Sequence, residues 1–176
     1  MDKLDQIIAA AGFPDFRWTD GSKIAVGQWV RLKCIYACDN FGRKANCPPN
    51  VPSVEECERF FSEYERIAVI HLEVPGCDDA GYCEWRTANN EALVALERDV
   101  FLAGHHKAMV LLSGTCSVCP ECATTREGCL HPGSGRPTPE ALAMDVFATV
   151  RSVGYPIEVL TDRSHTMNRY AFLLVE

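Results

Sequence analysis

Two short stretches crowded with cysteine restrict this chain more than any other feature. The second stretch reads Cys116-x2-Cys119-x2-Cys122-x6-Cys129, and Gly114 just before it gives the backbone freedom to turn. Thiols at three-residue steps in a tight, proline-broken loop cannot spread far apart, so we expect them to bind one centre together. Soft, anionic sulfur donors select iron–sulfur clusters or zinc over magnesium or calcium. The pattern therefore predicts a thiolate metal site.

The first stretch reads Cys34-x3-Cys38-x8-Cys47-Pro48-Pro49. The two prolines restrict Cys47 to an extended backbone and fix the direction in which the chain leaves it, which favours a ligand position. Three cysteines leave one coordination place open. A cluster with four thiolates suits electron transfer, whereas one with three leaves an iron that can act as a Lewis acid on a substrate.

The fourth ligand of this first set stays open in the sequence. Water, a substrate and further cysteines are candidates, the cysteines being Cys57, Cys77, Cys83 and Cys129. Cys57 lies inside a predicted helix, and a free cysteine there is more often a small core residue than a ligand. Cys77 and Cys83 lie in a predicted loop, where they fit either a ligand role or a reactive pair.

The spacing favours iron–sulfur over zinc. Structural zinc sites take their ligands as separated pairs, whereas three cysteines of the second stretch fall within one turn. That run is similar to the cysteine loop of ferredoxins, in which closely spaced thiolates hold one corner of a [4Fe–4S] cube. We therefore expect one or two [4Fe–4S] clusters, with zinc as the alternative.

Composition limits the number of domains, the partners and the cellular location that we expect. The chain has 176 residues, 47% of them hydrophobic, which is enough for one domain over residues 1–176. The formal net charge of −7 opposes binding to nucleic acid. The N-terminus has no secretory pattern and no window is long and apolar enough for a membrane span, so we expect a cytoplasmic protein without a membrane partner. Ten cysteines in such a compartment are poor material for disulfides.

The basic residues gather near the cysteines in spite of the acidic total. Arg43 lies in the first cysteine loop and Arg136 follows the second. Both are candidate residues for binding the cofactor or orienting an anionic ligand, and solvated loop charges are the plain alternative. Tyr36, Tyr82 and Trp85 are candidates for lining a pocket beside the cluster.

Helical and strand patterns alternate along the chain. Apolar residues at helical spacing, ended by capping or stop signals, predict helices over residues 2–11, 53–64, 87–103 and 138–153. Branched and apolar runs predict strands over residues 23–33, 67–74, 107–112, 157–160 and 169–175. This order predicts an α/β fold with a small, mostly parallel sheet flanked by helices. The cysteine-bearing loops follow the strands and should gather at one edge of that sheet.

Two composite motifs resemble a cysteine-rich family of unknown function, described only as predicted metal-binding proteins of anaerobic bacteria and archaea. The first motif is Cys-x3-Cys, a Tyr-Gly step and Cys-Pro-Pro; here the step is Phe41-Gly42, with Phe in place of Tyr, and Cys47 follows. The second is Gly-x-Cys-x2-Cys-x2-Cys, a later Cys and Pro, and a helix start that here begins at Arg136. The chain has Ala143 where the family pattern has Gly. The resemblance implies metal binding and no established reaction.

The leading hypothesis is a cytosolic iron–sulfur protein that transfers electrons to or from a redox partner protein. The second is an iron–sulfur enzyme whose three-cysteine cluster, with its open iron, acts on a small anionic substrate. The third is a zinc-stabilised interaction module without turnover.

Overall fold

The computed structural model describes residues 2–160 and 165–176. These residues form a four-stranded sheet in the order β1-β2-β4-β3, with every neighbouring pair antiparallel. The strands are β1 (Phe16–Thr19), β2 (Ile67–Val74), β3 (Met109–Leu111) and β4 (Met167–Leu174). The α-helices are α1 (Lys3–Ala10), α2 (Gln28–Ala37), α3 (Val54–Ser62), α4 (Asp79–Leu102) and α5 (Val146–Ser152). Two short 3-10 helices are η1 (Gly21–Lys23) and η2 (Glu140–Leu142).

The prediction of a mostly parallel sheet is wrong, although the mixed α/β composition is confirmed. Helix α4 does connect two strands that run in the same direction, because β2 and β3 are each antiparallel to β4. Strand β4 lies between them and separates the expected parallel pair. The unit is thus a split β-α-β arrangement, in which a strand from the far end of the chain enters the gap.

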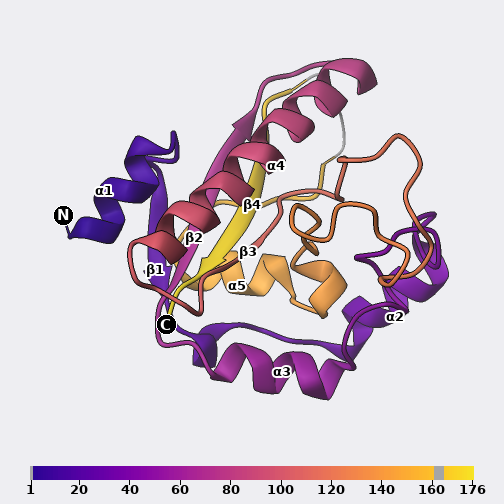
Figure 1. Cartoon of the computed structure of the whole chain (residues 1–176), viewed down its shortest axis with the longest axis horizontal. Helices are drawn as coiled ribbons and strands as arrows, with labels where there is room; N and C mark the ends of the chain where they lie inside the picture. The colour runs from indigo at the N-terminus through magenta and orange to yellow at the C-terminus, as the bar shows by residue number, and fades with distance from the viewer. Residues whose placement is uncertain (1, 161–164) are drawn as a thin grey trace.

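Helices cover both faces of the sheet. On one face α1 and α4 pack against the sheet through buried Leu4, Ile8, Leu93 and Leu96. On the other face lie Phe61 of α3, Val150 of α5 and the segment around Met144. Figure 1 shows α4 running along β2 and β4, with α3 well apart from α4 at the bottom of the view.

Strand β2 contributes residues to the hydrophobic cores on both faces of the sheet. Its alternate residues Ala68 and Ile70 face the first core, while Ile67 and Val69 face the second, and all are fully buried. A strand covered on both faces reads as a continuous apolar run, which is why its bounds match the predicted range. Its half-buried His71 is held by Asp15 and Asn168, at 2.7 and 2.8 Å from its ring nitrogens.

The predicted first strand, residues 23–33, is wrong. Only Val26 forms an isolated bridge, to Met144, and the chain then enters helix α2. Gly27 is the N-cap of this helix, and Cys34 lies in its last turns rather than after a strand. Trp29 is 48% exposed and Leu32 is 44% exposed, whereas Ile24 is buried in the core against the sheet without belonging to a strand.

The predicted helix over 138–153 is interrupted. A short turn, η2, ends at Ala143, whose φ of 58° is left-handed, and α5 begins after Asp145. An L-residue is strained in this conformation and glycine is not, which accounts for the glycine of the family pattern at this position. Residues 157–160 form no strand, contrary to prediction, whereas the predicted closing strand 169–175 is confirmed as β4.

Capping patterns predicted where helices begin better than apolar patterns predicted which strands pair. The predicted capping box is present: the Ser53 side chain accepts from the Glu56 amide, and the Glu56 carboxylate accepts from the Ser53 amide. Helix α4 starts earlier than predicted, at Asp79, because Asp78 caps it by accepting from the Gly81 amide. None of the described helices combines the length and apolarity needed to cross a membrane.

Candidate metal centre and its cavity

Both cysteine-rich stretches lie beyond one end of the sheet (Figure 1). The second stretch leaves the end of β3, and the first follows the C-terminus of α2. Strand β4 begins at this same end, because Met167 pairs with Val74, the last residue of β2. The loops after β2 and β3 leave strands that run in the same direction, whereas the first set of cysteines follows helix α2 and Cys83 lies within helix α4.

Hydrogen bonds tie the two cysteine loops together. Arg126 Nη1 donates to Asn46 Oδ1 at 2.8 Å. Asn50 Nδ2 donates to the Thr124 carbonyl at 2.7 Å and to the Lys44 carbonyl at 3.2 Å. Segments far apart in sequence thus meet side by side, and the two sets of thiols belong to one region of the molecule.

The second loop is also anchored to the scaffold. Thr87 Oγ1 donates to Ser117 Oγ at 3.1 Å, and Asn90 Nδ2 donates to the Thr115 carbonyl at 3.3 Å. The Leu112 amide donates to the Pro137 carbonyl at 3.0 Å. Both ends of the loop are therefore fixed to helix α4 and to strand β3.

The first set of thiols is electrostatically coupled to itself and to the second. Burial, followed by the negative charges of Cys38 and Cys34, raises the pKa of Cys47 to about 11. Cys122 of the second loop adds to the rise, and Lys44 opposes it. A thiol with a raised pKa keeps its proton at neutral pH until a metal ion replaces it, so metal uptake here releases protons.

Three thiols of the second loop act on the fourth, Cys119. Desolvation raises the pKa of Cys119, and the charges of Cys122, Cys116 and Cys129 raise it further. These three thiols therefore lie near enough to Cys119 to affect its ionisation.

The donor chemistry fits a thiolate metal site, but the structure does not present a closed ligand shell. All ten cysteines are free thiols, so none is used in a disulfide. Among the described residues, no group of three or more His, Cys, Asp or Glu side chains is arranged to hold a metal ion. Holding one would require the loops to draw neighbouring sulfur atoms closer together.

A cavity of about 280 Å³ lies against the first set of thiols. Cys34, Cys38 and Cys47 all line it, so the structure brings these three predicted ligands to one space. The other side of the cavity comes from the sheet end and from the start of helix α4. Those lining residues are Tyr82, Arg86, Ser113, Gly114 and Arg169.

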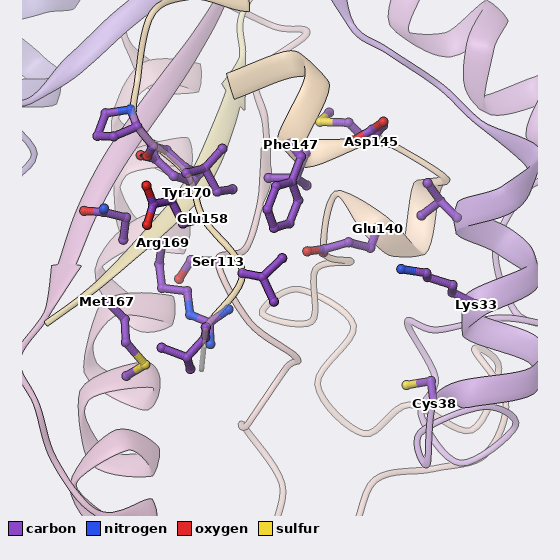
Figure 2. A pocket seen from close by; sticks show the side chains of 18 of the residues that line it. Lys33, Cys38, Ser113, Glu140, Asp145, Phe147, Glu158, Met167, Arg169 and Tyr170 are labelled. Carbon is purple, nitrogen blue, oxygen red and sulfur yellow. The ribbon is translucent and has the colours of Figure 1, made fainter. Parts of the chain in front are cut away.

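A second cavity, of about 800 Å³, adjoins the first and shares Cys34, Cys38, Ser113, Glu140 and Arg169 with it. Figure 2 shows its interior. The Arg169 side chain extends into the space from the sheet side, while Lys33, Cys38 and Glu140 point toward it from the opposite side.

The other cysteines fall into different surroundings. Cys57 is 1% exposed in the core and its thiol lies 3.7 Å from the Pro52 carbonyl, in agreement with a core role. Cys83 is exposed near the start of α4, and its Sγ atom accepts a hydrogen bond from Arg86 Nη2 at 3.8 Å. Cys77 is partly buried just before α4. Its sulfur lies close to the backbone of Gly81, since a Cβ atom added there would be 3.7 Å from it.

The two arginines chosen from the sequence have different surroundings. Arg136 forms a two-pronged ion pair with Glu97, with Nη2 to Oε1 at 2.6 Å and Nε to Oε2 at 2.9 Å. This pairing raises the pKa of Arg136 and ties the end of the second loop to α4. Arg43 is exposed in the first loop, and its side chain makes no hydrogen bond within the described residues. The guanidinium groups that line the thiol cavity instead belong to Arg86 and Arg169.

Sequence reasoning missed Arg86, Arg169 and Ser113, and no motif marks them. Arg86 lies on a helix face and Arg169 near the start of a strand, so each looks like an ordinary surface charge in the sequence. Of the aromatic candidates, Tyr82 does line the cavity, whereas Tyr36 is 83% exposed.

Comparisons with known proteins give one match. Searches of curated proteins and of solved structures found nothing similar to this chain. A family described as "Predicted metal-binding protein (DUF2284)" matches residues 17–175, which contain every cysteine of the chain. The match starts within β1 and runs to the residue after β4, so it spans the sheet and both cysteine loops. The chain therefore belongs to this cysteine-rich family of predicted metal-binding proteins.

Proposed function

We propose that this chain is a cytosolic iron–sulfur protein with [4Fe–4S] clusters as its metal centres and electron transfer as its role. One cluster is held by Cys116, Cys119, Cys122 and Cys129. A second is held by the three thiols of the first stretch, Cys34, Cys38 and Cys47. A redox partner protein is the expected partner.

The observation that carries this proposal is the meeting of two thiol sets from distant parts of the chain. The bonds from Arg126 to Asn46 and from Asn50 to Thr124 hold their loops together. The charge on Cys122 acts on Cys47. Two cubes placed side by side near a surface suit electron exchange, and the crowded spacing of the second set favours a cube over a tetrahedral zinc site.

A specific observation favours a second candidate function, an iron–sulfur enzyme. The first set supplies three thiols, and all three cysteines line one cavity. A cube with three thiolates has an iron that can take a substrate atom, and the cavity gives such a substrate a place to sit.

Anaerobic purification tests the proposal. We expect a brown protein with a broad absorption near ~400 nm and about four iron and four sulfide per cluster. Cys119→Ser and Cys38→Ser should each remove roughly half of the iron, because each variant breaks a different centre. A colourless protein with stoichiometric zinc would refute both iron–sulfur functions and support the zinc-stabilised module.

Electron paramagnetic resonance after mild oxidation separates carrier from enzyme. Loss of one iron to a three-iron species, confined to the centre that Cys38→Ser removes, indicates an open iron and supports the enzyme. Reversible one-electron cycling without loss of iron supports the carrier.

A further inference from the structure

Two arginines without an ion-pair partner face the three-thiol cavity. Arg86 comes from the N-terminal part of α4 and Arg169 from the start of β4, and both line the cavity beside Cys34, Cys38 and Cys47. Within the part of the chain that the structure describes, no carboxylate forms an ion pair with either of them.

Three buried polar atoms at this place have no hydrogen-bond partner among the residues that the structure describes. They are Arg86 Nε, Arg169 Nε and Ser113 Oγ, while Arg86 Nη2 donates to Cys83 Sγ. A buried N–H or hydroxyl donor without a partner is destabilising, so native proteins normally satisfy such groups. All three atoms belong to residues that line the cavity, and the outer Nη donors of the same two guanidinium groups suit a ligand that accepts hydrogen bonds.

The surrounding residues hold these donors in place. The Tyr82 ring contacts both guanidinium groups, with Arg86 Cζ 5.8 Å and Arg169 Cζ 5.6 Å from its centroid. Gly114 allows Arg86 to pass close to the backbone, since a Cβ there would lie 2.9 Å from Arg86 Cδ. Close approach, rather than a turn, is therefore what this glycine of the Gly-x-Cys motif provides.

The charge balance of the cavity favours an anion. Glu140, which is exposed, is the carboxylate among the residues that line the smaller cavity, against the two guanidinium groups. In the adjoining larger cavity Lys33 adds a positive charge, while Asp145 and Glu158 add negative ones. The Asp145 carboxylate is engaged as the cap of α5, where it accepts from the Ala148 amide.

We infer that Arg86, Arg169 and Ser113 form a binding site for a small oxyanion, a carboxylate or a phosphate, beside the three thiols. Guanidinium forks match the paired oxygen atoms of both groups. A cavity of about 280 Å³ admits a ligand of only a few heavy atoms. The inference rests on the proposed function in one respect: it places the anion next to the open iron of the proposed three-thiol centre.

Isothermal titration calorimetry on anaerobically isolated full-length protein tests the site with two probes, malonate and inorganic phosphate, in a chloride buffer. At least one probe should bind the wild-type chain, and the tighter of the two identifies the oxyanion class. Arg86→Gln and Arg169→Gln should each weaken its binding by about tenfold or more, because each removes a charge-assisted pair of hydrogen bonds. Ser113→Ala should weaken it severalfold.

Arg59→Gln is the matched control. Arg59 is exposed on α3, away from the cavity, and the substitution removes the same charge. Its binding should equal that of the wild type. Circular dichroism and thermal melting establish that each variant folds, and if Arg169→Gln does not fold, Arg86→Gln and Ser113→Ala decide the question.

The outcomes separate this inference from the proposed function. Absence of binding, or equal binding by wild type, Arg86→Gln and Arg169→Gln, overturns the anion site even in a brown, iron-loaded protein. That result would leave the arginines only to offset thiolate charge. Binding that both variants lose in a colourless, iron-free protein upholds the site and refutes the cluster.

Discussion

Arg136 shows how one residue can suggest a ligand-binding role and yet have a structural one. Its guanidinium group is 19% exposed and the Glu97 carboxylate that it pairs with is 12% exposed. Glu97 Oε2 also accepts from the Val110 amide at 2.7 Å. One carboxylate thus joins α4, β3 and the end of the second cysteine loop.

We predict that Glu97→Gln lowers the free energy of unfolding by about 3 kcal/mol, because removing one charge of a buried pair leaves the other uncompensated. Glu91→Gln, exposed on the same helix, should change it by less than about 0.5 kcal/mol. Urea denaturation measures both. Equal effects of the two substitutions would show that the Glu97–Arg136 pair adds nothing to stability.

At the scale of elements, the contact between the two cysteine loops matters more than either loop alone. Asn50 spans them, since its single amide group donates to carbonyl oxygens on both, Lys44 and Thr124. Groups that hold metal ligands in place through hydrogen bonds typically contribute about 10- to 100-fold to metal affinity.

Asn50→Ala should therefore speed metal release to a chelator by about tenfold or more and raise hydrogen exchange in both loops. Asn89→Ala is the matched control, because the Asn89 amide donates only to Trp85 within α4. Chelator kinetics followed by absorbance provide the measurement. If both variants release metal at the wild-type rate, the loop contact does not support the centre.

Across the whole molecule, the core and the cysteine loops are separate sources of stability. The two buried clusters on either face of the sheet contain Cys57 but none of the proposed ligands. The hydrophobic contacts that hold the sheet to its helices therefore do not depend on metal.

This separation predicts opposite results for two cysteine substitutions. Cys119→Ser should lose the metal of the second loop and keep the far-ultraviolet circular dichroism of the sheet and helices. Cys57→Ala should keep its metal but lower the free energy of unfolding by about 1–2 kcal/mol, as expected for removing a buried side-chain atom. Metal analysis and urea denaturation of both variants check this. Global unfolding of Cys119→Ser would show that metal, not the core, holds the fold.

Features that depend on neighbouring residues could be predicted from the amino-acid pattern. The capping box at Ser53 and the run of β2 both follow from residues a few positions apart. Short-range geometry limits these segments to few conformations, so the pattern is enough to predict them.

Tertiary structure alone decided what depends on distant segments. Residues 28–37 carry enough apolar side chains to suggest a strand, yet they form helix α2 outside the sheet. The insertion of β4 between β2 and β3 joins chain segments far apart in sequence, which no local pattern encodes. That insertion also brings Arg169 to the thiols, because a residue's neighbours across a sheet are set by strand order and register.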